Sequence, residues 1–196
     1  MISRPLVIAA LVMLALAFGM GFYVWHMRGV SSSELPAASH QAAVAPPVLG
    51  SSEQVTLFVA YDDIGVLRAE SFRIPLPEER QQRSEELLRT LLNVYLDKSS
   101  PHTLGVGSEV RNVYLVEPGL AVIDLNTAFA NGHRSGILVE ELTVASLVQT
   151  LSANVSGITR VKILVDGKER DTLAGHADLT SFYDVAAVNQ LAGELQ

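Results

Sequence analysis

The sequence contains no cysteine. This absence excludes structural disulfides, thiolate metal sites, a cysteine nucleophile and a lipid-modified cysteine as a membrane anchor. Basic residues are also few, since 14 Lys and Arg stand against 21 Asp and Glu, giving a net charge of −7. The basic residues are scattered rather than grouped in a stripe. Nucleic acid and an anionic membrane surface are therefore poor candidates as partners.

Motifs of common catalytic and metal sites are missing as well. The histidines of the expected folded part, His102, His133 and His176, form no HxH or HExxH pair, and isolated loop histidines are usually solvated, although the three could still converge in space. Ser108 lies in GVGSEV, which lacks the second glycine of a nucleophile elbow and does not fit GxGxxG. We predict no catalytic, cofactor-binding or metal-binding residues. Asn154 begins a glycosylation sequon, NVS, which matters only in a glycosylating compartment.

One long apolar run is present near the start. Residues 6–25 read LVIAALVMLALAFGMGFYVW without a charge, and as a helix they would span about 30 Å, enough to cross a bilayer core. The run is longer than a signal peptide's apolar region of roughly 7–15 residues, and bulky rather than small residues follow it. We predict an uncleaved single-pass anchor at 6–27 behind a short cytoplasmic tail, 1–5, with the rest of the chain on the extracytoplasmic side of the cell membrane.

The chain changes character after the anchor. Residues 28–53 are rich in Ser, Ala and Pro and show no apolar periodicity, which predicts a flexible tether. The folded domain is expected at 54–184. Residues 185–196 are expected to form a C-terminal tail, with at most a helical turn after Asp184.

Two hairpins are predicted in the folded domain. VTLFVAY (55–61) and VLRAESFRI (66–74) have strand-like composition and are separated by Asp and Gly turn residues. EVRNVYLVEPGLAVIDL (109–125) forms two extended segments around a Pro-Gly turn at 118–119. Proline at positions 75 and 77 should end the first sheet.

Two amphipathic helices are also predicted. The first follows Pro77, and its apolar residues recur at spacings of three and four: Leu87, Leu88, Leu91, Leu92, Tyr95 and Leu96. The second, 137–151, carries little charge and should be more buried. Between them, 126–136 reads as a loop from which Phe129 enters the core. We expect an α+β fold, with a mainly antiparallel sheet covered by two helices, in the order ββα-ββα-β, preceded by one transmembrane helix.

Two carboxylates end predicted strands, Asp124 in AVIDLN and Asp166 in KILVDG. If those strands were neighbours, the carboxylates could meet as an acid–base pair. The structural interpretation is favoured, because Asp166 and Gly167 form the two-residue connection preferred in hairpins. Asp124 precedes Asn126 in a loop where a short carboxylate can accept amide hydrogen bonds.

Three segments together resemble the GerMN domain of bacterial envelope proteins. They are GLAVIDLNTAF (119–129), LTVASLVQTLSANVSGITRVKILVDGKE (142–169) and LAGHADLT (173–180). The resemblance spans about residues 54 to 184 and implies a non-catalytic domain, usually tethered to the outer face of the cytoplasmic membrane. It supplies no catalytic residues, and it implies a protein-interaction or scaffold role. The chain departs from the family pattern in having one copy of the domain, no lipid-attachment cysteine and a plain helical anchor.

The favoured hypothesis is therefore a membrane-anchored envelope protein, not an enzyme, whose single GerMN-like domain contacts envelope proteins or cell-wall material. One alternative is an envelope hydrolase using Asp124, Asp166 and His176. Another is a small-ligand binding module with a pocket beside 126–136.

Overall fold

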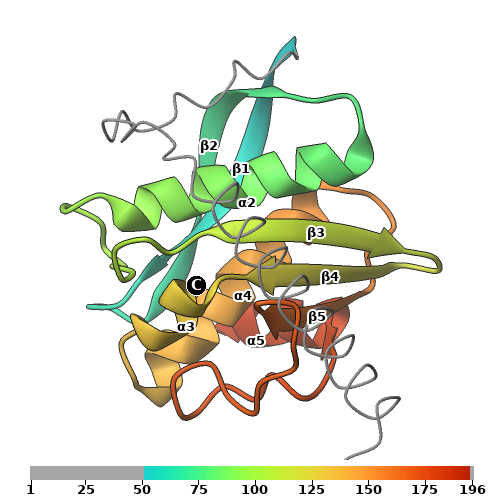
Figure 1. Ribbon diagram of the computed structural model, residues 1–196. Helices are drawn as coiled ribbons and strands as arrows, with labels where there is room; N and C mark the ends of the chain where they lie inside the picture. The colour runs from blue at the N-terminus through green and yellow to red at the C-terminus, as the bar shows by residue number, and fades with distance from the viewer. Residues whose placement is uncertain (1–50, 195–196) are drawn as a thin grey trace, which may run out of the picture. The chain divides into compact units, whose positions relative to one another are not determined.

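The computed structural model describes residues 51–194. Along the chain the elements are β1 Ser51–Tyr61, β2 Val66–Leu76, α2 Arg80–Leu96, β3 Val110–Val116, β4 Leu120–Leu125, α3 Thr127–Asn131, α4 Ile137–Asn154, β5 Arg160–Val165, β6 Tyr183–Asp184 and α5 Val185–Glu194 (Figure 1). The predicted cytoplasmic tail and anchor, 1–27, and residues 28–50 of the predicted tether lie outside the described residues. Between 51 and 194, no helix combines the length and apolar composition needed to cross a bilayer.

The α+β class is confirmed and the strand pairs are mainly antiparallel, but the expected single sheet is wrong. β1 and β2 form a two-stranded sheet, and a second sheet has the order β3-β4-β5-β6. β4 and β5 pair in parallel, because α4 carries the chain back along the sheet before β5 begins, as a crossover helix does. The order also departs from ββα-ββα-β, since it includes α3, β6 and α5.

The first hairpin forms as predicted, with different ends. β1 pairs antiparallel with β2 from Ser51↔Leu76 to Tyr61↔Val66. β1 starts at Ser51, inside the segment predicted as tether, and β2 continues through Pro75 to Leu76. Proline is tolerated in this strand because a two-stranded sheet leaves one side of each strand free of ladder hydrogen bonds.

α2 begins at Arg80 rather than at Pro77. Glu79 caps it by accepting the amide hydrogens of residues 81 and 82 at 2.9 and 2.7 Å, which satisfies donors that a helix start leaves unpaired. The predicted apolar face is confirmed, except that Leu96 at the end of the helix is exposed. This face is formed by Leu87, Leu88, Leu91, Leu92 and Tyr95.

The predicted loop 126–136 contains the short helix α3. The Asn126 side chain accepts the Phe129 amide at 2.9 Å and so caps this helix. The Phe129 side chain is fully buried, as predicted. The second hairpin, β3–β4, also forms as predicted, with a bulge between Val110 and Asn112.

α4 is the central helix of the domain, lying behind the four-stranded sheet (Figure 1). It contacts β1, α2 and α5, and its side chains are buried in every direction from Leu142 to Leu151. A helix buried all round is normally apolar, yet α4 carries buried Thr143, Ser146 and Thr150. The expectation that this helix is the more buried of the two is confirmed.

The polar side chains of α4 pair with the free edge of β1. Asn154 accepts the Thr56 amide at 3.1 Å and donates to the Thr56 carbonyl at 2.7 Å. Thr150 Oγ1 accepts the Phe58 amide at 3.0 Å, and Ser146 Oγ donates to the Phe58 carbonyl at 2.6 Å. We call these three α4 side chains the α4 ladder. They supply the partners that a neighbouring strand would otherwise provide.

Tyr95 of α2 completes this edge. Its hydroxyl accepts the Ala60 amide at 2.9 Å and also contacts Ser146 Oγ. Burial raises the pKa of Tyr95, so the hydroxyl stays neutral and can act as both donor and acceptor.

The C-terminal segment predicted as a tail is a packed helix. β6 pairs antiparallel with β5, and α5 follows directly, with Val188 and Ala192 buried. β5 buries Val161, Ile163 and Val165 as its alternation predicts, but Lys162 is buried too. The three donors of that ammonium group are used by the carbonyls of residues 179 and 180, at 3.0 and 2.6 Å, and by the carboxylate of residue 169 at 2.9 Å.

Candidate functional site

The two strand-end carboxylates lie together, because β4 and β5 are neighbours. Leu125 pairs with Val165, which places Asp124 and Asp166 at the same end of the sheet. Arg111 Nη1 lies 3.1 Å from Asp166 Oδ1 and 3.7 Å from Asp124 Oδ2. The two carboxylates are therefore neighbours, as an acid–base pair requires. The guanidinium group of Arg111, however, contacts both of them.

Both carboxylates take part in the turn that follows β5. Asp166 and Gly167 have φ values of 50° and 71°, which is the geometry of the predicted two-residue hairpin connection. Val165 and Lys168 close the turn with backbone hydrogen bonds of 2.9 and 3.1 Å. The Gly167 amide donates to Asp124 Oδ1 at 2.7 Å. The predicted turn is confirmed. The charged segment that follows it, 168–171, forms a single bridge, between Lys168 and Val165, and no strand.

The electrostatics of this cluster oppose proton transfer. The Thr127 hydroxyl donates to the Asp166 carboxylate, and this bond, together with the Arg111 charge, lowers the pKa of Asp166. A general acid at neutral pH needs a raised pKa instead. Arg111 lies in the β3 bulge, a feature that re-aims side chains. The arrangement ties the adjacent ends of β3, β4 and β5 together.

His176 has different partners from those of the carboxylate pair. Its Nδ1 lies 2.9 Å from Glu140 Oε1 and 3.4 Å from Ser135 Oγ. Glu140 Oε2 also accepts the amides of Ala174, His176 and Ala177 at 3.0, 2.9 and 2.9 Å. Neither Asp124 nor Asp166 is among the hydrogen-bond or ion-pair partners of His176. The triplet of the hydrolase alternative is therefore divided between two clusters.

Glu140 is fully buried at the start of α4. Burial alone would raise its pKa, but His176 and the three loop amides outweigh burial and lower it to about 2. The group is therefore a permanent anion that organises the 173–177 loop. The sequence predicted only that this helix carries little charge. The available signal was the pair of acids, Glu140 and Glu141, near the start of an otherwise apolar helix.

His102 and His133 are buried, so the expectation that they lie in solvated loops is wrong. His102 Nδ1 lies 2.6 Å from Asp62 Oδ1, and its Nε2 lies 2.9 Å from Thr143 Oγ1. His133 Nε2 lies 2.7 Å from the same hydroxyl. Burial lowers the pKa of both histidines, while Asp62 opposes this effect at His102.

The hydrogen bonds that link Asp62 to His102 and His102 to Thr143 have the connectivity of a catalytic triad. Thr143 is fully buried inside α4, however, and its hydroxyl also contacts the Val139 carbonyl of its own helix at 2.9 Å. A nucleophile must reach substrate, and this hydroxyl has no access. Between residues 51 and 194, no group of three or more His, Asp and Glu side chains is placed to hold a metal ion.

Ser108 and Asn154 have structural contacts. Ser108 is buried, and its hydroxyl donates to the Gly105 carbonyl at 2.6 Å. A Cβ at Gly105 would lie 2.7 Å from Gly132 Cα, so glycine permits two loops to touch here. The Asn154 amide is occupied by β1 and by its own helix, which leaves the folded sequon no free amide for a glycan.

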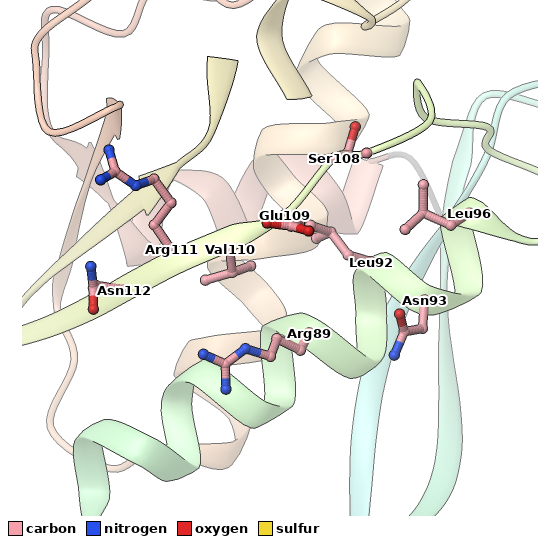
Figure 2. Close-up of a pocket in the computed structure, with 10 residues that line it drawn as sticks. Arg89, Leu92, Asn93, Leu96, Ser108, Glu109, Val110, Arg111 and Asn112 are labelled. Atoms are coloured by element: carbon pink, nitrogen blue, oxygen red, sulfur yellow. The ribbon is translucent and has the colours of Figure 1, made fainter. Parts of the chain in front are cut away.

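A groove of about 580 Å³ lies between the end of α2 and the start of β3. Figure 2 shows Arg89, Asn93 and Leu96 on α2 and the residues of β3 that form the other wall. Its lining is Arg89, Leu92, Asn93, Leu96, Gly107, Ser108, Glu109, Val110, Arg111 and Asn112. None of these residues falls in 126–136, but Gly107 and Glu109 are hydrogen-bonded to Asn126, so the groove borders the segment beside which a ligand pocket was expected. Its walls meet only in the folded chain, and no local pattern could have located it.

The groove does not concentrate charge of one sign. Arg89 lies 3.4 Å from Glu85 on its own helix, and Arg111 is paired with Asp166. The lining combines apolar, amide and ion-paired side chains, without a nucleophile beside a base. Such a surface suits binding better than bond cleavage.

Comparison with known proteins identifies one matching family model. The model of Germane, described as sporulation and spore germination, matches residues 56–171. No curated protein matches the chain.

Three solved structures are similar to the chain. A candidate lipoprotein from Clostridium perfringens is 18% identical, with a TM-score of 0.47, and the match covers 72% of this chain and 92% of that one. The first GerMN domain of the sporulation protein GerM from Bacillus subtilis is 23% identical, with a TM-score of 0.48, covering 66% and 95%. The tandem GerMN domains of the same protein are 23% identical, with a TM-score of 0.47, and the match covers 67% of this chain and 45% of that one.

Proposed function

Because the chain belongs to the Germane family of sporulation and spore germination domains, we propose that it presents one non-catalytic GerMN domain for binding in a cell envelope. The family match confirms the resemblance drawn from 119–129 and 142–169, and it ends before the third segment, 173–180. The proposed role is to contact envelope proteins or cell-wall material and hold them at the membrane. It requires no cofactor.

One observation supports the non-catalytic part of the proposal. Asp124 accepts a turn amide, and Asp166 is bound by Arg111 and Thr127, which lower its pKa. A carboxylate pair that cleaves a bond needs a member with a raised pKa as general acid.

The cellular setting follows from the sequence. The apolar run at 6–27 would anchor the chain as a single pass, and 28–50 would connect it to β1. This arrangement would hold the domain outside the membrane without a lipid group. The sequence offers no cysteine for a lipid anchor, so the proposal assigns the anchoring role to the apolar run.

The test is in-cell cross-linking of the full chain, compared with a version that lacks 55–184. We expect discrete cross-linked species that disappear with the domain. The single variants Asp124→Asn, Asp166→Asn and His176→Gln should recover the same species in the same amounts as Glu78→Gln, an exposed control. Loss of cellular function in these three variants, with unchanged abundance, folding and cross-links, would favour a hydrolase and overturn the proposal.

A further inference from the structure

Three large apolar side chains are exposed where two segments meet. Ile64 in the β1–β2 turn is 51% exposed, and Ile137 and Leu138 in the first turn of α4 are 61% and 41% exposed. A Cβ at Gly65 would lie 2.9 Å from Leu138 Cδ2, so the turn and the helix touch. We call Ile64, Ile137 and Leu138 the apolar tip. Contiguous exposed apolar surface commonly marks an interaction site.

The segments that carry the apolar tip are held in place by buried polar groups. In the turn, Asp62 binds His102 at 2.6 Å and Arg134 at 2.8 Å through its two oxygens. At the start of α4, the Gly136 amide donates to Glu140 at 3.1 Å. These contacts hold the β1–β2 turn and the first turn of α4 in place, so both segments are ordered before a partner binds. Pre-organisation lowers the entropic cost of association.

The apolar tip lies at one end of β1. The described residues begin at Ser51, the first residue of β1, whereas the tip begins just past Tyr61, its last residue. The two ends of this eleven-residue strand are about 33 Å apart at ~3.3 Å per residue. Ser51 and the tip therefore lie at opposite ends of β1 (Figure 1).

Acidic side chains flank the apolar tip. Asp63 precedes Ile64 and is exposed, and Glu141 is exposed at helical spacings of four and three from Ile137 and Leu138. The nearby cation Arg134 is paired with Asp62. The surface therefore combines exposed aliphatic groups with unneutralised negative charge, which an apolar segment carrying positive charge would complement.

We propose that the apolar tip docks a segment of a partner protein that presents aliphatic or aromatic side chains beside Lys or Arg. The inference rests on the proposed binding function and specifies where and what the domain binds. Apolar contacts at the three tip residues provide affinity. The charges of Asp63 and Glu141 select the basic partner and repel acidic ones.

The first experiment uses two synthetic probes on the full chain in nanodiscs of neutral lipid. One is a short amphipathic peptide of Leu and Lys, and the other is its Leu and Glu counterpart. We expect the Leu/Lys peptide to bind more tightly, and the double variant Ile64→Ser/Ile137→Ser to weaken it by about tenfold. Val116→Ser, at an exposed apolar position on β3, is the matched control and should bind normally. Equal binding of both peptides, or equal loss in the control, contradicts the proposal.

The second experiment places a photo-cross-linking amino acid at position 64, 137 or 116 of the chain in the producing cell. Adducts at 64 and 137 should map to partner peptides that contain both apolar and basic residues, and position 116 should give none. Adducts only to lipid, or only to a second copy of the chain, would overturn the choice of partner. Adducts at 116 alone would leave the binding function standing and refute the apolar tip. Failure of the binding function itself is read separately, from the cross-linking comparison between the full chain and the version that lacks 55–184.

Discussion

The two long helices differ in how deeply their polar contacts are buried. On α4, Ser146, Thr150 and Asn154 bind the edge of β1, and Glu140 and Thr143 bind loops far away in sequence. α4 is therefore a polar template around which other segments are arranged, despite its burial.

α2 makes most of its polar contacts nearer the surface, both within the helix and to other segments, as where Arg83 binds Glu53 of β1. Arg89 pairs with Glu85 and Glu86 one turn away, and the Thr90 hydroxyl donates to the Glu86 carbonyl. Glu85 also reaches β3, where it accepts the Val113 amide at 3.3 Å. The groove opens beside this helix, because α2 covers the edge of β3 without sealing its whole length. The contrast predicts that the loss of a polar group costs more stability on α4 than at the exposed positions of α2.

The largest effect is expected at Glu140. Glu140→Gln replaces an anion that accepts several buried amides, and should destabilise the fold by about 3 kcal/mol, the value of a pKa held near 2. The measurement is urea denaturation followed by circular dichroism. Glu141→Gln, one residue along and exposed, is the matched control and should change stability by less than about 0.5 kcal/mol. Equal effects would remove the distinction between buried and exposed charges on α4.

Acid should produce a loss of similar size through the same group. The Glu140 pKa is about 2 in the folded chain and its ordinary value is 4.5, so its contribution is present above pH 4.5 and lost as pH falls toward 2. His102 and His133 act in the same direction, because their lowered pKa values make protonation below about pH 6.5 favour unfolding. Denaturation midpoints measured from pH 7 to 3 should fall, and the decline below pH 4.5 should be shallower in Glu140→Gln. A curve of unchanged steepness would contradict the assignment.

A pair of threonines tests the two helices directly. Thr150→Val on α4 leaves the Phe58 amide without its partner and should cost about 1–2 kcal/mol. Thr90→Val on α2 removes only a hydrogen bond to its own helix and should stay within about 0.5 kcal/mol. Both are nearly isosteric, so a comparison of unfolding free energies isolates the hydroxyl. Similar losses would show that α2 contributes as a template too.

The smallest effect is expected at Arg89. Arg89→Ala removes exposed ion pairs with Glu85 and Glu86 and should change stability by less than about 0.5 kcal/mol. The change should shrink further when unfolding is measured in high salt. A larger, salt-independent loss would mean that Arg89 supports the groove wall by packing.

Short-range signals predicted the parts of the fold that depend on neighbouring residues. The hairpins, the apolar spacing of α2 and the Asp166–Gly167 turn are of this kind, because turn chemistry and periodicity act within a few residues. Burial of His102 and Lys162 was not foreseen, since the partners of His102 lie 40 and 41 residues away. The acceptors of Lys162 belong to a loop without periodicity.

The candidate site was likewise predictable only where residues close in sequence define it. Strand ends suggested Asp124 and Asp166 as a pair on the condition that β4 and β5 were neighbours, but Arg111 is 55 residues from Asp166 and carries no motif. Ser146, Thr150 and Asn154 recur at spacings of four, and nothing in the local sequence indicates what they contact. Only the three-dimensional position of β1, 88 to 98 residues away in sequence, shows that they face a strand.

The spacing of the α4 ladder matches the spacing of β1 over only a short length. Four residues of helix advance about 6.0 Å, whereas two residues of strand advance about 6.7 Å. Starting together at Asn154 and Thr56, the helix lags by about 1.4 Å after two steps. The third side chain, Ser146, accordingly donates to the Phe58 carbonyl instead of accepting the next amide, that of Ala60. The Ala60 amide is accepted by Tyr95 of α2. An α-helix can thus stand in for a β-strand over about two steps, and a longer sealed edge needs a second helix to restore the register.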